Sequence, residues 1–594
     1  MLFSFIVLFL LNSRAIPARF VFIWERLFSP FYVVVTPSFI ACSLSSVSFF
    51  SVIATLYCDR YPICSKNKML CKDNANEFLC GKLNQNEPIN TVVNDFAALL
   101  LQQKHAATGL FSASDNGSFP ASPNLSLCRG MIQDIQPEVS LFAVGKNDFF
   151  SYSGEDTSET AFLDATLLYV IPVPNSVCLY PGGTTESSNA ALKRDREEME
   201  REQPLPAAKN VKHYLNLPHE PVSRGLAKGC IVTVLNPAGN SFKLNEIVDF
   251  YGYTHIEDPI DTSTLDGSET LDVWRNCTLS NSLVARFISF AHTPFHPTIN
   301  TCLTVDYFAS MRQKVIGILN KYLTNNDSLL SEMVLLHLCS KVIQHTGSTP
   351  LGDVPLLVSA GAISAKGWSA VLQRFLAAGE TFVDGDAIKR CRTSLTPKYN
   401  VDENFLQTGL LQVGDGSHIT FDCDNLSPTL TEGTSDLLFN LVHHQRLSVE
   451  YPYHKIDVPV DVGVLALTTK PQNLPLLFKF AFSVTANDVV PNPSPMSPAE
   501  AEEVQTYLNS VRQVEASFIH QDEVRDHLAN QLVELSNAEE KWNNRDCVLH
   551  NNTFSVVAAV VRSHSLSVGC TSIDNTHIDY ILSLERARLS RNVL

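Results

Sequence analysis

Two spacings of apolar residues divide the chain into β-rich and helical stretches. From residue 127 to 255, short runs rich in Val, Ile and aromatic residues alternate apolar and polar positions, most clearly at 229–235 and 242–255. This alternation is typical of half-buried strands. Residues 311–323 and 329–344 instead repeat apolar side chains at the i, i+3, i+4 and i+7 spacing of amphipathic helices. The chain therefore combines a β-rich region with a helical one.

The second half of the chain changes pattern twice. After Pro350, strand and helix patterns alternate to about residue 485, which indicates an α/β layer. Ser497-Pro498-Ala499-Glu500 then provides an N-cap, a first-turn proline and a capping-box glutamate. We expect the helices that follow at 498–519, 521–543, 552–567 and 574–591.

These patterns predict a fold of the α/β plus β class. A mixed-charge run at 183–210 has no apolar stripe to bury, so we expect it to be a linker inserted into a small β-barrel of the oligonucleotide-binding (OB) type. The predicted segments are an atypical apolar N-terminus at 1–110, the β-rich domain at 111–260, a helical connector at 261–345, an α/β domain at 346–490 and a helical lid at 491–594.

The N-terminal residues fit poorly with the rest. MLFSFIVLFLL resembles a signal-peptide core, and residues 27–58 are uncharged and long enough to span a bilayer. Pro30 and Pro37 interrupt this stretch, however. Residues 1–57 therefore leave open a membrane or secretory segment, a buried accessory segment, or a start that is not genuine. Glycosylation motifs carry little weight without a secretory route, and they occur at Asn116, Asn124, Asn276, Asn326 and Asn551.

Composition narrows the kinds of partner. The chain has 61 acidic residues against 44 Lys and Arg, a net charge of −17, which disfavours a broad phosphate-binding face. We therefore expect a protein partner and no direct sequence-specific nucleic-acid binding. The 15 cysteines include no CxxC pair and are expected to be mostly free thiols. The most closely spaced cysteines are Cys58, Cys64, Cys71 and Cys80. The intervals between them are wider than in a zinc knuckle, so no metal site is expected.

LLVSAGAISAKGWSAVLQRFL, residues 356–376, is the strongest candidate for ligand chemistry. A working phosphate loop surrounds the phosphates with backbone N–H groups, uses a lysine for their oxygens, and uses the next Ser or Thr to hold Mg²⁺. Lys366 is present, and Gly361 and Gly367 give the turn its freedom, but Gly367 has no hydroxyl for the metal. A plain strand–turn–helix with a surface lysine is the alternative.

A second motif, TGLLQVGDGSHITFDCDNL at 408–426, predicts a hairpin about Gly414-Asp415-Gly416 and then an apolar strand ending at Asp422. A hydrolytic ATPase would need an acid next to this aspartate to orient water. The next residue is Cys423, whose neutral thiol cannot act as that base. We therefore expect no catalytic residue. Three histidines are expected in the core or in loops rather than as ligands: His337, His443 and His444.

In order, these segments resemble the ATPase module of the MCM replicative helicase family. The family's phosphate loop has Ala-Lys-Ser where this chain has Ala365-Lys366-Gly367, and its acidic strand has a glutamate where this chain has Cys423. LPLLFKFAFSV, 474–484, resembles the arginine-finger segment, with Lys479 in place of the arginine. The resemblance implies a degenerate AAA+-like domain, a helical lid, and non-functional remnants of a nucleotide site at Gly361, Lys366, Gly367, Asp422, Cys423 and Lys479.

The family of mini-chromosome maintenance complex-binding proteins is more similar still, over about residues 120–594. Four segments resemble sequences that recur in this family: RGMIQD at 129–134, FKLNEIVDFYG at 242–252, TGLLQV at 408–413 and YHKIDVPVDVGVLALT at 453–468. The resemblance implies a nuclear protein that binds MCM helicase subunits, contacts chromatin indirectly, and is not an enzyme, with no cofactor and no small-molecule substrate.

The same resemblance implies a role in DNA replication, by assembling, exchanging or unloading MCM subunits, and in sister-chromatid cohesion. Two alternatives stay open. One is a residual nucleotide-binding ATPase that uses Lys366 and Asp422. The other is a membrane-anchored protein defined by residues 1–57.

Overall fold

A computed structural model describes most of the chain after residue 70, and these residues fall within one compact unit, Met69–Leu594. No helix in the described ranges is long and apolar enough to cross a membrane. Residues 1–57, the linker 183–210 and Lys479 lie outside these ranges. The described ranges are 71–109, 124–136, 140–144, 149–150, 161–176, 230–235, 242–255, 285–295, 304–347, 349–390, 395–401, 405–478, 480, 482–486, 496–514, 522–539 and 553–591.

The predicted small barrel is confirmed as a closed barrel of five strands, in the order β2-β6-β7-β5-β4, with β4 pairing back to β2. The β5–β7 pairing is parallel, and the other pairings within the barrel are antiparallel. β7 lies in the range 261–345 that we expected to be helical. The strands of this sheet are β1 (Thr108–Gly109), β2 (Ser126–Ile135), β3 (Ser140–Val144), β4 (Ala161–Ile171), β5 (Cys230–Leu235), β6 (Ile247–His255) and β7 (Ala285–Pro294).

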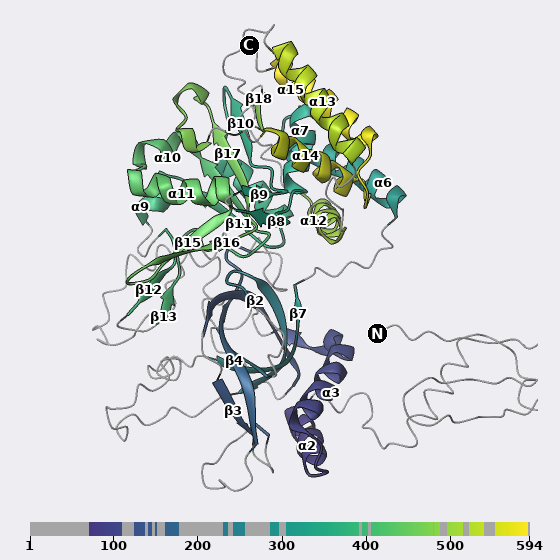
Figure 1. The fold of residues 1–594 in the computed structure, drawn as a ribbon, viewed down its shortest axis with the longest axis vertical. Helices are drawn as coiled ribbons and strands as arrows, with labels where there is room; N and C mark the ends of the chain where they lie inside the picture. Colours follow the sequence, from purple (N-terminus) through teal and green to yellow (C-terminus); the bar gives the residue numbers. More distant parts are fainter. Residues whose placement is uncertain are drawn as a thin grey trace, which may run out of the picture. The chain divides into compact units, whose positions relative to one another are not determined.

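Two helices that the sequence patterns did not predict pack against the barrel. They are α2 (Lys72–Leu83) and α3 (Ile89–Gln102), followed by the 3₁₀ turn η3 (Lys104–Ala106), and α3 lies beside β7 (Figure 1). Phe96 of α3 packs edge-on against Phe290 of β7, with ring centroids 4.9 Å apart. Both rings belong to an apolar cluster shared by the helices and one end of the barrel.

The predicted α/β layer is confirmed as a sheet of five parallel strands in the order β11-β14-β17-β10-β18. All five residues of β10 are buried, which fits a sequence that is apolar except for Ser359. The strands are β10 (Leu356–Ala360), β11 (Glu380–Val383), β14 (His418–Asp422), β17 (Gly463–Thr468) and β18 (Ser483–Ala486). The helical elements of this layer are α8 (Ala365–Phe375), α9 (Gly385–Arg390), α10 (Cys423–Leu426), η5 (Ser427–Thr429), α11 (Glu432–His444), η6 (Pro471–Asn473) and η7 (Leu476–Phe478).

A smaller sheet accompanies the parallel one. Its order is β13-β12-β15-β16, and β16 is an edge strand. The strands are β12 (Lys398–Asn400), β13 (Phe405–Gln407), β15 (Arg446–Glu450) and β16 (Lys455–Pro459), and a separate two-stranded ribbon contains β8 (Gln344–Thr346) and β9 (Thr349–Leu351).

The hairpin that we predicted about Gly414-Asp415-Gly416 is wrong. Strand β14, which follows this turn, pairs in parallel with β11 and β17, whereas the preceding strand β13 pairs with β12. In the turn, Asp415 N donates to Asn245 O of the barrel segment at 2.8 Å, and Gly416 N donates to Asp461 O at 2.7 Å. A glycine-rich turn specifies local backbone angles but not the strands that pair on either side of it.

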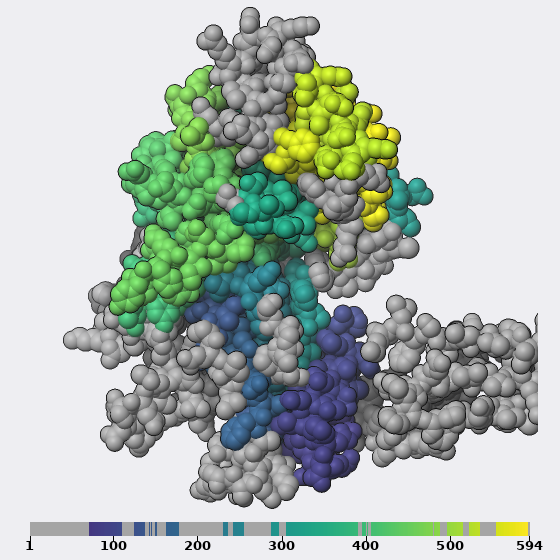
Figure 2. Space-filling view, viewed as in Figure 1, coloured from purple at the N-terminus to yellow at the C-terminus, as the bar shows by residue number. Residues whose placement is uncertain are grey.

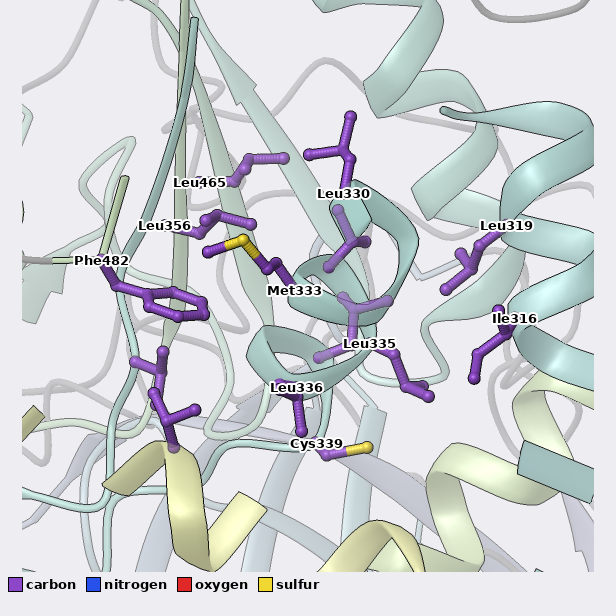
Figure 3. Packing of buried hydrophobic residues seen from close by; sticks show 14 of the residues in the cluster. Ile316, Leu319, Leu330, Met333, Leu335, Leu336, Cys339, Leu356, Leu465 and Phe482 are labelled. Carbon is purple, nitrogen blue, oxygen red and sulfur yellow. The ribbon is translucent and has the colours of Figure 1, made fainter. Parts of the chain in front are cut away.

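The helices of the second half pack on one another and on the parallel sheet. Figure 3 shows α7 between Leu356, Leu465 and Phe482 on the sheet side and Ile316 and Leu319 of α6. The capping box at Ser497 and Glu500 and the four predicted C-terminal helices are confirmed, while the helix predicted at 329–344 ends at Leu338. The helices are α6 (Val305–Tyr322), α7 (Ser328–Leu338), α12 (Pro498–Gln513), α13 (Asp522–Glu539), α14 (Thr553–Ser567) and α15 (Asn575–Arg591).

Candidate functional site at the carboxyl edge of the parallel sheet

Polar residues collect where the parallel strands end. Lys366 lies in the first turn of α8, Asp384 follows β11, Asp422 ends β14 and Thr468 ends β17. In open parallel sheets, ligands bind at this edge. The carboxyl edge is therefore the candidate site, and five of the residues singled out from the sequence lie along it: Gly361, Lys366, Gly367, Asp422 and Cys423.

The turn after β10 is capped from within the chain. Ser364 is the N-cap of α8, and its hydroxyl accepts a hydrogen bond from Gly367 N at 3.3 Å. This hydroxyl takes up one of the N–H groups that a phosphate would otherwise use. Ile363 packs against the main apolar cluster, and Gly361, just after β10, is exposed. The turn is folded as a capped helix start.

The lysine of the turn has a carboxylate neighbour. Lys366 Nζ lies 3.9 Å from Asp384 Oδ2, with the lysine side chain 74% exposed and the aspartate side chain buried. Asp384 Oδ1 also accepts a hydrogen bond from Ala387 N at 2.6 Å, at the start of α9. Asp384 was not identified from the sequence, although an aspartate between a strand and a helix is a recognisable N-cap pattern.

Asp422 and Cys423 are both occupied structurally. The Asp422 carboxylate accepts from Asn425 N at 3.3 Å and from Asn425 Nδ2 at 2.6 Å, which caps the short helix α10. Cys423 is buried, and burial raises the pKa of its thiol well above the ordinary value. The thiol therefore stays neutral and cannot accept a proton from water, as the sequence indicated.

A carboxylate that the sequence analysis did not single out links α10 to the end of β17 at this edge. Asp424 accepts hydrogen bonds from Thr468 Oγ1 at 2.7 Å, from Thr469 N at 2.8 Å and from the Thr469 hydroxyl. Burial alone would raise the pKa of Asp424, but these hydrogen bonds outweigh burial, and its pKa lies below the ordinary value. Asp424 thus fixes the end of β17 to the start of α10.

A buried acid lies beneath the helix that starts at the candidate loop. Ser369 Oγ of α8 donates to Glu380 Oε2 of β11 at 2.5 Å, and Glu380 Oε1 has no hydrogen-bond partner within the described part of the chain. Burial raises the pKa of Glu380 to about 7. The sequence offered no signal for this pair, because each residue alone suits an exposed position.

The histidines have structural partners. The expectation that His337 packs in the core is confirmed, because it is buried and its Nδ1 lies 2.6 Å from Val354 O. His443 Nε2 lies 2.8 Å from Leu477 O, and the ring of His444 packs against Phe439. Within the described ranges, no group of three His, Cys, Asp or Glu side chains is arranged to hold a metal ion.

The geometry at this edge defines a class of protein. Its centre is a strand–turn–helix unit of a parallel sheet with Lys366 in the first helical turn, and Lys366, Asp422 and Asp424 each contact groups of the same chain. Gly367 and Cys423 offer neither a metal-binding hydroxyl nor a base. The class is a mixed α/β protein with a small closed barrel, in which these three polar side chains at the carboxyl edge contact other groups of the chain.

Comparison with known proteins identifies the family. The mini-chromosome maintenance replisome factor family matches residues 179–592, which is most of the chain. The chain therefore belongs to this family.

Curated relatives agree with that assignment. A mini-chromosome maintenance complex-binding protein of Arabidopsis thaliana is 26% identical over 388 residues, which cover 61% of this chain and 63% of the relative. The proteins of the same name in Gallus gallus and Drosophila melanogaster are 26% and 23% identical, covering 40% and 41% of this chain and 42% and 44% of the relatives. The chain spans less than two thirds of the length of each of these relatives.

Proposed function

We propose that this protein binds subunits of the MCM helicase complex and acts in DNA replication without catalysing a reaction of its own. Its relatives are named for binding the mini-chromosome maintenance complex. In this proposal it assembles, exchanges or unloads MCM subunits in the nucleus, contacts chromatin through them, and supports sister-chromatid cohesion. The net charge of −17 favours such a protein partner over DNA.

One observation carries the non-catalytic part of the proposal: the carboxyl edge has its polar groups engaged within the chain. Lys366 lies beside Asp384, and Asp422 is committed to capping α10. A nucleotide would have to break these contacts, and Gly367 and Cys423 could not replace the missing metal ligand and base. In this proposal the protein acts by binding its partners and does not hydrolyse a nucleotide.

The parallel sheet and the helices α12–α15 also support descent from an ATPase module. We propose that 346–490 is a degenerate AAA+-like domain, that 491–594 corresponds to a helical lid, and that the barrel is of the OB type. A body with this architecture can dock against true helicase subunits as a subunit-like partner. Gly361, Lys366, Gly367, Asp422, Cys423 and Lys479 are, in this proposal, remnants of a nucleotide site.

Affinity capture tests the binding function. The full-length chain, tagged and expressed in dividing cells, should recover MCM subunits in amounts comparable to the bait when bound proteins are identified by mass spectrometry. A tagged unrelated acidic protein is the control. If MCM subunits are absent while the chain enters membranes, the helicase-partner proposal fails and the apolar residues 1–57 become the place to look.

A nucleotide assay tests the non-catalytic part separately. The purified chain should show no ATP hydrolysis above background, with or without MCM subunits. The alternative, a residual ATPase, predicts turnover that is lost in Asp422→Ala and in Lys366→Ala. Turnover with that sensitivity would overturn the proposal of an inactive body even if MCM subunits were captured.

A further inference from the structure

Strand β16 presents an open edge to solvent. It ends the four-stranded sheet β13-β12-β15-β16, and its only partner strand within the described ranges is β15. Four of its five residues are exposed, with Val458 half-buried. The Ile456 side chain is 44% exposed, and Lys455 is 61% exposed. Figure 1 labels the strands of this sheet, which belong to the green part of the chain on the left of Figure 2.

The turn of the hairpin determines which backbone groups point outward. Tyr451 N donates to His454 O at 2.9 Å, and the register then pairs Glu450 with Lys455 and Val449 with Ile456. Hydrogen-bonded and non-hydrogen-bonded pairs alternate along an antiparallel ladder. Ile456 therefore directs its N–H and C=O toward β15. Its neighbours Lys455 and Asp457 direct theirs away from β15, and the Asp457 carbonyl also accepts a long hydrogen bond from Arg446 Nη1 at 3.5 Å.

This alternation restricts how a second copy of β16 could pair with the first. An antiparallel partner must place outward-facing residues opposite each other. A two-fold axis at Val458 or Pro459 would use Pro459, which has no N–H to donate, so the remaining positions for the axis within the strand are Lys455, Ile456 and Asp457. An axis at Lys455 or Asp457 sets like charges opposite each other, which is unfavourable. An axis at Ile456 sets Lys455 of each copy opposite Asp457 of the other. The sequence Lys-Ile-Asp is thus complementary to itself in one register only.

The side chains agree with this register. Residues opposite each other in a sheet share a face, so Ile456 lies on the same face as the buried Val449. The two-fold axis brings Ile456 of both copies together as a non-hydrogen-bonded pair, in which side chains approach most closely. Pro459 lacks an N–H at an outward-facing position, which suits the end of such a pairing.

We propose that β16 is a self-association surface, and that two copies of the chain pair through antiparallel β16 strands with the axis at Ile456. The inference goes beyond the proposed function and does not depend on it. The simpler alternative is that Lys455 and Pro459 only protect an edge strand from pairing, since Lys455 Nζ also lies 2.8 Å from Glu450 Oε1 of its own hairpin. The experiments below distinguish the two.

Charge reversal is the first test. Sedimentation velocity of the purified full-length chain over a wide concentration range should reveal a monomer–dimer equilibrium. Lys455→Asp and Asp457→Lys each create like-charge pairs across the axis and should weaken self-association by about tenfold or more. The double variant restores complementarity and should associate like the wild type. An equimolar mixture of the two single variants should form heterodimers, because each strand then meets its opposite charge.

A cysteine scan is the second test. With Ile456→Cys, the two thiols lie at the non-hydrogen-bonded position on the axis, within disulfide reach, and mild oxidation should give a covalent dimer. Tyr453→Cys is the matched control, because Tyr453 is 98% exposed but lies at the turn, away from the axis. The wild-type chain, oxidised in the same way, is the control for disulfides between the native cysteines. Circular dichroism tests whether each variant is folded.

Three results would overturn the proposal. A chain that remains monomeric at all concentrations shows that the edge is merely protected. Self-association that ignores the single charge reversals, or that the double variant and the mixture fail to restore, places the contact elsewhere. Equal cross-linking of Tyr453→Cys and Ile456→Cys indicates random collision. Capture of MCM subunits by Lys455→Asp at the wild-type level would show separately that helicase binding does not require this surface.

Discussion

The Nε2 atoms of His337 in α7 and His418 in β14 lie 2.8 Å apart, inside the core. One Nε2 atom must donate and the other accept. The two facing Nε2 atoms therefore cannot both carry a proton without repulsion. Burial lowers the pKa of His337 to about 4 and lowers the pKa of His418 well below the ordinary value, where the neighbouring imidazole lowers it further. The pair joins the helical layer to the parallel sheet only while it is neutral.

This pair predicts a loss of stability in acid. In the unfolded chain these histidines take up protons near pH 6.5, whereas folded His337 does not until about pH 4, and the pKa of folded His418 also lies well below its ordinary value. The free energy of unfolding should therefore decrease as the pH falls from about 6.5 to 4, by about 3 kcal/mol from His337 alone. Urea unfolding at a series of pH values should show a smaller decrease for His337→Gln, and the exposed control His105→Gln should match the wild type. Parallel curves for both variants would contradict the prediction.

Asp415 predicts the opposite pH dependence. Burial, and after it the nearby Asp461, raises the pKa of Asp415 to about 7 from an unfolded value near 3.8. The folded state holds this proton between these values, so its contribution to stability decreases as the pH rises from about 4 to 7. Asp415→Asn should gain about 2 kcal/mol on the wild type between pH 5 and pH 8. The exposed Asp436→Asn should gain nothing in the same urea titrations.

The ion pair at the candidate site predicts unequal effects of its two partners. Asp384→Ala removes the acceptor for Ala387 N at the start of α9 and should cost about 1–2 kcal/mol of unfolding free energy. Lys366→Ala removes only an exposed contact and should cost less than about 0.5 kcal/mol. Urea unfolding midpoints measure both. A larger cost for Lys366 than for Asp384 would mean that the lysine has a role absent from this geometry.

A fourth prediction concerns Leu406, one of the positions at which the α/β body contacts the barrel. Gln133 Nε2 donates to Leu406 O, and Leu406 N donates to Asp134 Oδ2 at 3.1 Å, so two adjacent barrel side chains hold both backbone groups of Leu406. Gln133→Ala leaves the Leu406 carbonyl buried without this donor and should cost about 1–3 kcal/mol. Hydrogen exchange should speed up in the peptide containing Leu406, but not in the exposed control Gln102→Ala.

Local sequence patterns predicted the parts of the fold that depend on neighbours in sequence. The buried run of β10, the capping box at Ser497 and the C-terminal helices follow from residues a few positions apart. Side-chain pairs between distant segments leave no such pattern. The residues of the pairs His337–His418 and Ser369–Glu380 are distant or unrelated in local pattern, so the residues around each one do not indicate its partner.

The candidate site was likewise predicted only in part from the sequence. The sequence alone shows that Gly367 has no hydroxyl and that Cys423 has no carboxylate. The contacts that occupy the site come from Asp384 and Asp424, which lie at strand ends and whose roles depend on which strands are neighbours. Strand order was the missing information, as the wrong hairpin prediction at Gly414 also demonstrates.

The position of β10 has a consequence for the protein's synthesis. This strand lies between β17 and β18, and both of its partners are translated long after it. Once Leu356–Ala360 has been synthesised, this mostly apolar strand cannot form the hydrogen bonds of its two edges until Gly463–Thr468 and Ser483–Ala486 have also been synthesised. Such non-local pairing folds slowly and exposes unpaired edges meanwhile. Nascent chains of this protein should therefore depend on chaperones over this interval, and truncations that end before β18 should aggregate.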